Sequence, residues 1–119
     1  MSGPVPCGSA PRCVASVDER RRHRVAPIGY TGTRGAARER LLAALAELTR
    51  VEVVTARADY VHAVARTRWL RFVDDLECWL PADQRLIHVR SASRVGYYDL
   101  GVNRDRVERL REAFNRAEG

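Results

Sequence analysis

The sequence contains no lysine. All 21 basic side chains are arginine, and with 15 acidic residues they give a formal net charge of +6 over 119 residues. No apolar run approaches the roughly 20 residues that span a bilayer, which excludes an integral membrane protein. The start of the chain lacks a charged segment followed by an apolar stretch, so no secretory signal is predicted. The 45% apolar and 30% charged residues are typical of one soluble globular domain.

Cysteine is scarce: the three cysteines are Cys7, Cys13 and Cys78. An odd count without a secretory signal favours free thiols in a reducing compartment, and we therefore expect a cytoplasmic protein. Cys7 and Cys13 lie in a Gly/Ser/Pro-rich segment and could still reach each other as a disulfide. They form no zinc site alone, because no second Cys/His pair stands at ligand spacing. Cys78 is expected to be buried filler, and no motif implies a cofactor or a metal ion.

Positive charge is concentrated in residues 1–40, which hold eight arginines and three acidic residues. The densest run is Arg20-Arg21-Arg22-His23-Arg24. Such a run could follow the phosphates of nucleic acid or an acidic membrane surface, or it could be a solvated basic segment. Because the chain lacks a recognition helix, a zinc finger and an aromatic RNA-stacking motif, nucleic acid is not the expected partner.

Hydrophobic periodicity predicts two helices. Residues 1–35 are rich in Gly, Pro, Ser and Thr and lack periodicity, which favours an extended N-terminal arm. Apolar residues at helical spacing predict one helix over 36–49 and a second over 104–116. For the second helix we expect Asn103 as the N-cap, with Val102 packed against Val107 as a hydrophobic staple.

Four strands are predicted between these helices, over residues 51–56, 59–67, 70–80 and 85–91. Connections of two to four residues join antiparallel neighbours, because a parallel crossover needs a dozen residues or more. The expected fold class is therefore α+β: a helix, a four-stranded antiparallel meander sheet and a C-terminal helix, forming a single domain over 36–119.

Period-two alternation separates the two faces of the predicted sheet. If the apolar residues share the helix-covered face, the open face collects Tyr60, His62, Arg66, Asp75, Glu77, Trp79, His88 and Arg90. Two histidines and two carboxylates there could bind a metal or do acid–base chemistry, although cross-strand Arg–carboxylate pairs are ordinary on a solvated face. Asp74 falls among the core-facing residues, so it needs a partner such as an arginine near the end of the neighbouring strand.

The segment from 90 to 106 joins the last strand to the second helix. A helix N-terminus favours anions, yet Arg104 and Arg106 occupy the predicted first turn. Either acidic residues of the chain or a bound carboxylate or phosphate must neutralise them. Serine hydroxyls would add donors, and Gly96 and Gly101 would allow close backbone approach. The candidate ligand-binding residues are Arg90, Ser91, Ser93, Arg94, Asp99, Asn103, Arg104 and Arg106.

Three motifs carry a family resemblance. They are Cys7-x5-Cys13-Val14-x-Ser16, Phe72-Val73-Asp74-Asp75-x-Glu77 and a run from Ile87 to Arg106 of the pattern IHVRSASRxGxxDxGxNRxR. Together they resemble the DUF1499 family, of unknown function, over nearly the whole chain. Many members resemble secreted, lipid-anchored or membrane-tethered proteins, and others are lumenal in plastids. We do not carry that location over, because this chain lacks an N-terminal anchor.

The chain also departs from the family's usual pattern. It has Arg12 and Ala15 where the family usually shows Asn and Ser. Val64 stands where an acidic residue is common, which removes one carboxylate from the proposed open face.

Three hypotheses for the function follow. The first is binding of a small anionic molecule through the Arg/Ser-rich loop and helix N-terminus. The alternative is an enzyme with Asp75 or Glu77 as general base and with Arg94 and Arg104 stabilising developing negative charge, although no nucleophile–base motif is present. The third is a structural or partner-binding module in which the Arg/Asp network pins the last loop. If they are exposed, the candidate contact residues for a protein partner are Trp69, Trp79, Tyr97 and Tyr98; the alternative for at least half of them is a place in the core.

Overall fold

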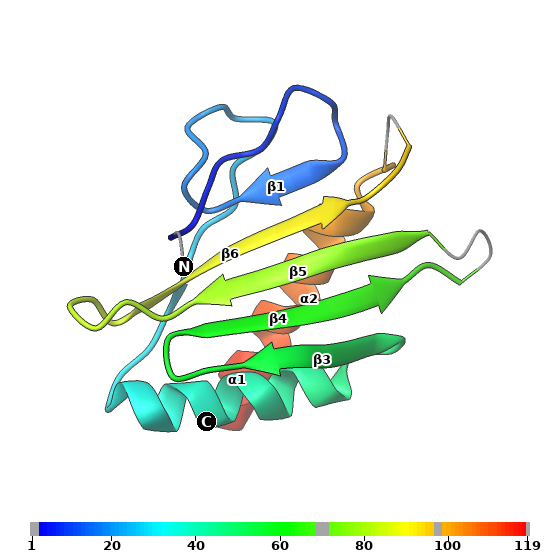
Figure 1. Ribbon diagram of the computed structural model, residues 1–119. Coiled ribbons are helices and arrows are strands. Elements are labelled where there is room, and N and C mark those ends of the chain that lie inside the picture. Colours follow the sequence, from blue (N-terminus) through cyan, green and yellow to red (C-terminus); the bar gives the residue numbers. More distant parts are fainter. Residues whose placement is uncertain (1–2, 69–71, 97–98, 119) are drawn as a thin grey trace.

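The computed structural model describes residues 3–68, 72–96 and 99–118, except for the side chain of Glu118. The elements in chain order are β1 (Cys13–Ala15), β2 (Ile28–Gly29), α1 (Arg34–Glu47), β3 (Val51–Ala56), β4 (Tyr60–Arg66), β5 (Val73–Trp79), β6 (Leu86–Ser93) and α2 (Val102–Glu118). The predicted strand residues 70 and 71, and the proposed contact residues Trp69, Tyr97 and Tyr98, lie outside the described residues. Figure 1 shows one twisted sheet with α2 behind it.

The strands follow the order β1-β6-β5-β4-β3, and β2 also pairs with β6. The meander from β3 to β6 confirms the four predicted strands and their antiparallel pairing. The prediction of four strands was nevertheless incomplete, since β1 and β2 add two from the segment expected to be an extended arm. Strands of three and two residues are too short for their alternation to be recognised in the sequence.

Both helices begin two residues earlier than predicted. Thr33 caps α1, because its hydroxyl accepts a hydrogen bond from the Ala36 N–H at 3.1 Å. The prediction of Asn103 as N-cap of α2 is wrong: the helix begins at Val102, and the Asn103 side chain is fully buried. Asp99 serves the start of α2 instead, accepting the Gly101 N–H on its side chain at 2.9 Å.

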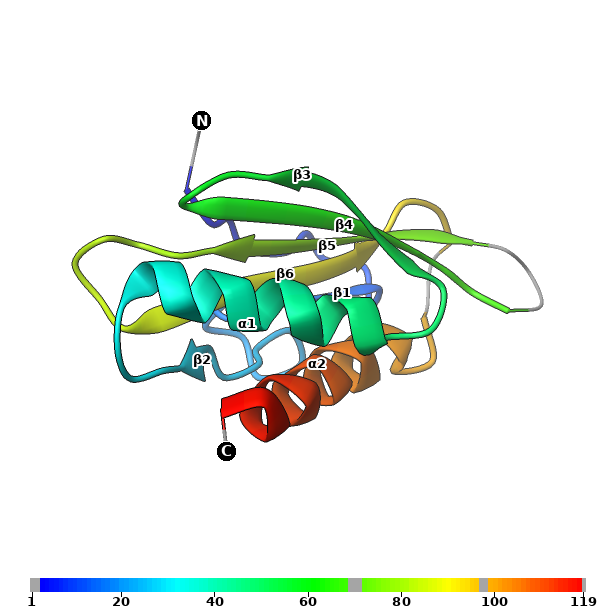
Figure 2. The same cartoon turned by 90° about the horizontal axis from the view of Figure 1, so that it is seen from below.

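Both helices cover the same face of the sheet (Figure 2). The predicted alternation is confirmed there, because the core-facing strand residues are buried. They are Val61, Ala63, Leu76, Cys78, Ile87 and Val89, and they pack with Leu41 and Leu45 of α1 and Leu110 and Phe114 of α2. Cys78 is a free thiol, and burial raises its pKa to about 12. The opposite face of β4, β5 and β6 carries the polar residues.

Candidate functional site

Asp75 lies on the open face between His62 and Arg94. Its Oδ1 is 2.7 Å from His62 Nε2, while Arg94 donates from Nε to Oδ2 at 2.8 Å and from Nη2 to Oδ1 at 2.9 Å. The hydrogen bonds from Arg94, and then that from His62, hold the pKa of Asp75 below its usual range. A carboxylate whose ionised form is stabilised in this way is a weaker general base.

Glu77, the second proposed base, is also held by neighbours. The Tyr60 hydroxyl donates to its Oε2 at 2.6 Å, and Arg90 Nη1 lies 3.6 Å from its Oε1. Burial, together with the hydrogen bond to Glu77, raises the pKa of Tyr60. The Tyr60 ring packs against that of Trp79 with centroids 5.5 Å apart, and Trp79 is buried.

His88 contacts a residue that the sequence reasoning did not select. Its Nδ1 is 3.1 Å from the hydroxyl oxygen of Ser16, which itself accepts the Val89 N–H at 2.9 Å. The Ser16 hydroxyl oxygen therefore contacts both the backbone of β6 and the ring of His88. Within the described ranges, no group of three or more His, Cys, Asp and Glu side chains is placed to hold a metal ion.

The proposed ligand-binding residues divide among several environments. Ser91 and Asn103 are fully buried, and the Ser91 hydroxyl donates to Asn103 Oδ1 at 2.6 Å. Asn103 Nδ2 faces three acceptors: the Arg12 carbonyl, the Ser93 hydroxyl and Asp99 Oδ2, at 2.7–3.1 Å. Asn103 therefore ties α2 to β6 and to the residue before β1.

Arg104 contacts the N-terminal segment of the chain. Its guanidinium donates to the backbone carbonyls of Arg24 at 2.9 Å and Arg22 at 3.0 Å. These bonds join α2 to the N-terminal segment. Asp75 and Arg94 of the proposed acid–base set come together, whereas Arg104 has its partners elsewhere.

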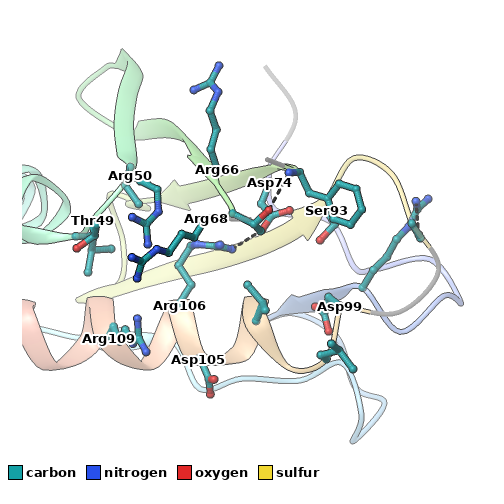
Figure 3. Close-up of a pocket in the computed structure, with 18 of the residues that line it drawn as sticks. Thr49, Arg50, Arg66, Arg68, Asp74, Ser93, Asp99, Asp105, Arg106 and Arg109 are labelled. Atoms are coloured by element: carbon teal, nitrogen blue, oxygen red, sulfur yellow. Dashed lines mark hydrogen bonds and ion pairs between the residues drawn. The ribbon is translucent and has the colours of Figure 1, made fainter. Parts of the chain in front are cut away.

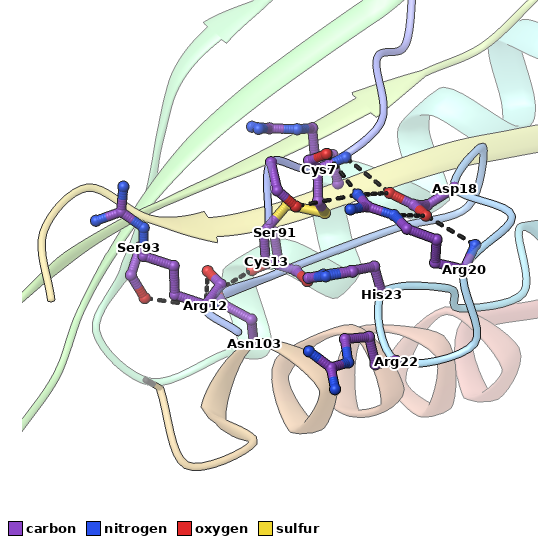
Figure 4. The surroundings of a disulfide bond; sticks show 12 residues. Cys7, Arg12, Cys13, Asp18, Arg20, Arg22, His23, Ser91, Ser93 and Asn103 are labelled. Carbon is purple, nitrogen blue, oxygen red and sulfur yellow. Dashed lines mark hydrogen bonds and ion pairs between the residues drawn. A yellow bond between two sulfur atoms is a disulfide. The ribbon is translucent and has the colours of Figure 1, made fainter. Parts of the chain in front are cut away.

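A disulfide joins Cys7 to Cys13 (Figure 4), so the expectation of free thiols is wrong for these two residues. The buried Asp18 organises this loop, accepting the Cys7 N–H at 2.9 Å and an Arg20 guanidinium N–H at 2.7 Å. The Arg20 hydrogen bond lowers the pKa of Asp18. His23 is also buried, with Nδ1 3.0 Å from the Cys13 carbonyl. Two members of the basic run therefore make contacts within this segment: the exposed Arg20 and the buried His23.

Asp74 is fully buried on the helix-covered side, as its strand position predicts. Its Oδ2 lies 2.9 Å from Arg106 Nη1, although the pair lacks the alignment of a hydrogen bond. The partner expected for Asp74 was an arginine at the end of a neighbouring strand, and that expectation is wrong. Arg106 comes from α2, and no local sequence pattern links residues 32 positions apart.

A cavity of about 500 Å³ opens between the sheet and the first half of α2 (Figure 3). Its lining includes six arginines and three aspartates: Arg12, Arg50, Arg66, Arg68, Arg106, Arg109, Asp74, Asp99 and Asp105. Of the predicted ligand residues, Ser93, Asp99 and Arg106 line this cavity. The other arginines were not predicted as site residues, because they come from separate segments of the chain. The only signal in the sequence is the three-residue spacing of Arg106 and Arg109, which places them on one face of a helix.

The arginines are not spread evenly. In Figure 3, Arg50, Arg68, Arg106 and Arg109 gather near one end, whereas Ser93 and Asp99 lie toward the other and Arg66 points away. Arg50 belongs to the turn between α1 and β3, Arg68 follows β4, and the last two lie on α2. The fold thus places arginines from three segments in the lining of one cavity.

These features define a class: an α+β protein with two helices on one face of an antiparallel sheet and an arginine-lined cavity beside the second helix. A comparison with protein families matches residues 5–114 to DUF1499, described as a protein of unknown function. The chain belongs to this family, as the three motifs predicted. No curated protein and no solved structure shows significant similarity to it. None of the described helices is long and apolar enough to cross a membrane.

Proposed function

We propose that the protein binds a small anion, carrying a carboxylate or a phosphate, at the arginine end of the cavity. The cluster of Arg50, Arg68, Arg106 and Arg109 supports this proposal. Guanidinium groups match carboxylate and phosphate oxygens with two parallel hydrogen bonds. Positive charges that line one cavity repel one another, so a bound anion would stabilise the arrangement.

The proposed anion site is not the one that the sequence predicts, which was the loop and the N-terminus of the second helix. Asp99 already accepts the hydrogen bond at the start of α2, while Arg90, Arg94 and Arg104 have partners within the chain. Arg106 lines the cavity as well, and it is ion-paired there with the buried Asp74 at 2.9 Å. We therefore assign to the loop a supporting role, in which it holds one wall of the cavity, and we place the anion nearer Arg50.

Arg50 offers a sharp test because its backbone has φ of 58°, a conformation that favours glycine. Arg50→Gly removes the guanidinium and also relieves this strain. We expect inorganic phosphate to bind about 10- to 100-fold more weakly, as befits the loss of a charged hydrogen bond. The free energy of unfolding should stay the same or rise by about 1 kcal/mol.

The matched controls are Arg94→Ala, on the open face, and Arg85→Ala, in the turn between β5 and β6. Both remove one positive charge but leave the cavity intact, so phosphate affinity in calorimetric titration should stay within about twofold of wild type at the salt concentration used. Equal losses in all three variants would indicate a non-specific charge effect. No phosphate binding by the wild type would overturn the proposal.

The acid–base alternative has less support. Asp75 and Glu77 each have two partners, and the lowered pKa of Asp75 makes it a weaker base. The structural alternative is supported for the loop itself by the Asn103 network.

The disulfide also bears on location. A reducing cytoplasm, which the cysteine count favoured, keeps thiols reduced, whereas an oxidising compartment preserves a bond such as Cys7–Cys13. We propose an oxidising compartment. Thiol labelling of protein trapped in acid at cell lysis should then modify Cys78 alone after denaturation, and labelling of all three cysteines would support the cytoplasm.

A further inference from the structure

We infer that the anion bound in this cavity is an amphiphile: a carboxylate or phosphate attached to an apolar chain. This inference rests on the proposed function and specifies its ligand. It begins with the exposed large apolar side chains of the described residues. Of the six, three line the cavity: Phe72, Val95 and Leu100, which are 40%, 55% and 77% exposed. Apolar groups gathered at one opening mark a binding surface more than scattered ones do.

The backbone provides an independent observation. Among the described residues, only two other than glycine have positive φ: Arg50 at 58° and Leu100 at 57°. Both line the same cavity. Left-handed backbone is rare for leucine, and sites of strain concentrate where a protein binds or reacts. Burial of the side chain does not explain the left-handed backbone of Leu100, because that side chain is largely exposed to solvent.

The two strained residues suit two different parts of one ligand. Arg50 lies in the arginine cluster, and Leu100 follows Asp99, which lies toward the other end in Figure 3. Leu48, Val51 and Val102 add apolar lining. A charged head at the cluster and a hydrocarbon tail running toward Leu100 would contact both. A volume of about 500 Å³ is within the range of small-molecule sites.

The test is a homologous series, titrated calorimetrically into the full chain below the critical micelle concentration. The probes are acetate, hexanoate, octanoate and decanoate, with inorganic phosphate and decyl phosphate as the second pair. We expect affinity to rise about two- to fourfold per added methylene over the part of the tail that is buried. Decyl phosphate should then bind at least tenfold more tightly than inorganic phosphate.

Leu100→Asn tests the tail alone, because asparagine tolerates left-handed backbone and the fold should be retained. Decyl phosphate should lose at least threefold in affinity, whereas inorganic phosphate should bind as to wild type. Val5→Asn is the matched control: Val5 is 43% exposed but does not line the cavity, and both affinities should be unchanged.

Failure of this inference differs from failure of the proposed function. If inorganic phosphate binds and Arg50→Gly weakens that binding at least tenfold, but decyl phosphate binds no more tightly than phosphate, the amphiphile is overturned and the anion site stands. If none of the probes binds, both are overturned. Vesicles of phosphatidylcholine with and without phosphatidic acid distinguish the source: co-sedimentation with the acidic vesicles supports a membrane lipid, and tight decyl phosphate binding without it supports a free amphiphile.

Discussion

The two sides of the sheet differ in how their charged side chains are paired. On the open face, Asp75 and Glu77 each have two partners within the chain. The cavity on the other side is lined by six arginines and three aspartates. Asp74 is paired there with Arg106, and Asp99 accepts a hydrogen bond from Asn103. The acidic residues of the open face are thus paired with neighbouring side chains, whereas the cavity lining contains more arginines than aspartates.

Adjacent residues show the contrast most clearly. Asp74 and Asp75 are neighbours in β5, but alternation sends one into the core and the other toward solvent. The same residue type therefore has a structural task on one side and a place in a surface ion-pair network on the other. A cluster of complementary charges on a sheet is weak support for a catalytic site when all of them are paired.

The largest expected effect is the difference in stability between variants of these two aspartates. Asp74→Ala leaves the mostly buried Arg106 without its carboxylate, which should lower the free energy of unfolding by about 3–5 kcal/mol. Asp75→Ala removes a pair whose side chains are 25% and 52% exposed, and should cost about 1 kcal/mol or less. Urea denaturation of the two variants measures the difference. Similar losses would contradict the contrast between the two sides.

The disulfide should have the next largest effect. Replacing Cys7 and Cys13 by alanine frees a short loop, and the free energy of unfolding should fall by about 2 kcal/mol. The Ser93 N–H, which donates to the Arg12 carbonyl at 2.9 Å, should exchange faster with solvent. Amides of β4, far from this loop in the strand order, should keep their relative protection. Equal changes in both places would show that the disulfide acts on the whole fold.

The smallest expected effect is the change in stability when Asp75 is protonated at low pH. Because its pKa is lowered in the folded protein, Asp75 stabilises the fold above its ordinary value of 3.8, and this contribution is lost as the pH falls through the lowered pKa. In Arg94→Ala, NMR titration should show the Asp75 pKa closer to 3.8 and a smaller loss of stability on acidification. An unchanged Asp75 pKa would show that Arg94 is not its main partner.

Much of the fold was predictable from periodicity. The buried alternation of Val61, Ala63, Leu76 and Cys78 identified the core-facing side of the sheet, and helical spacing located both helices to within two residues. The two short strands were not predictable, because they form through pairing with β6 rather than through a pattern of their own.

The candidate site was less predictable. Cross-strand neighbours such as Glu77 and Arg90 follow from register, so the open face could be assembled from the sequence. The arginine cluster depends on how α2 and the turn after α1 pack together, and no local spacing encodes that. The spacing of Cys7 and Cys13 allowed a disulfide between them. The odd number of cysteines favoured free thiols instead, and that expectation was wrong.

The most direct test of the account is a titration of isotopically labelled protein with inorganic phosphate, followed by NMR at each backbone amide. We predict that the largest shifts fall on residues 49–51, 67–68 and 105–109, around the arginine end of the cavity, with little change at His62, Asp75 and Glu77. Shifts centred on the open face, or none at saturating phosphate, would contradict it.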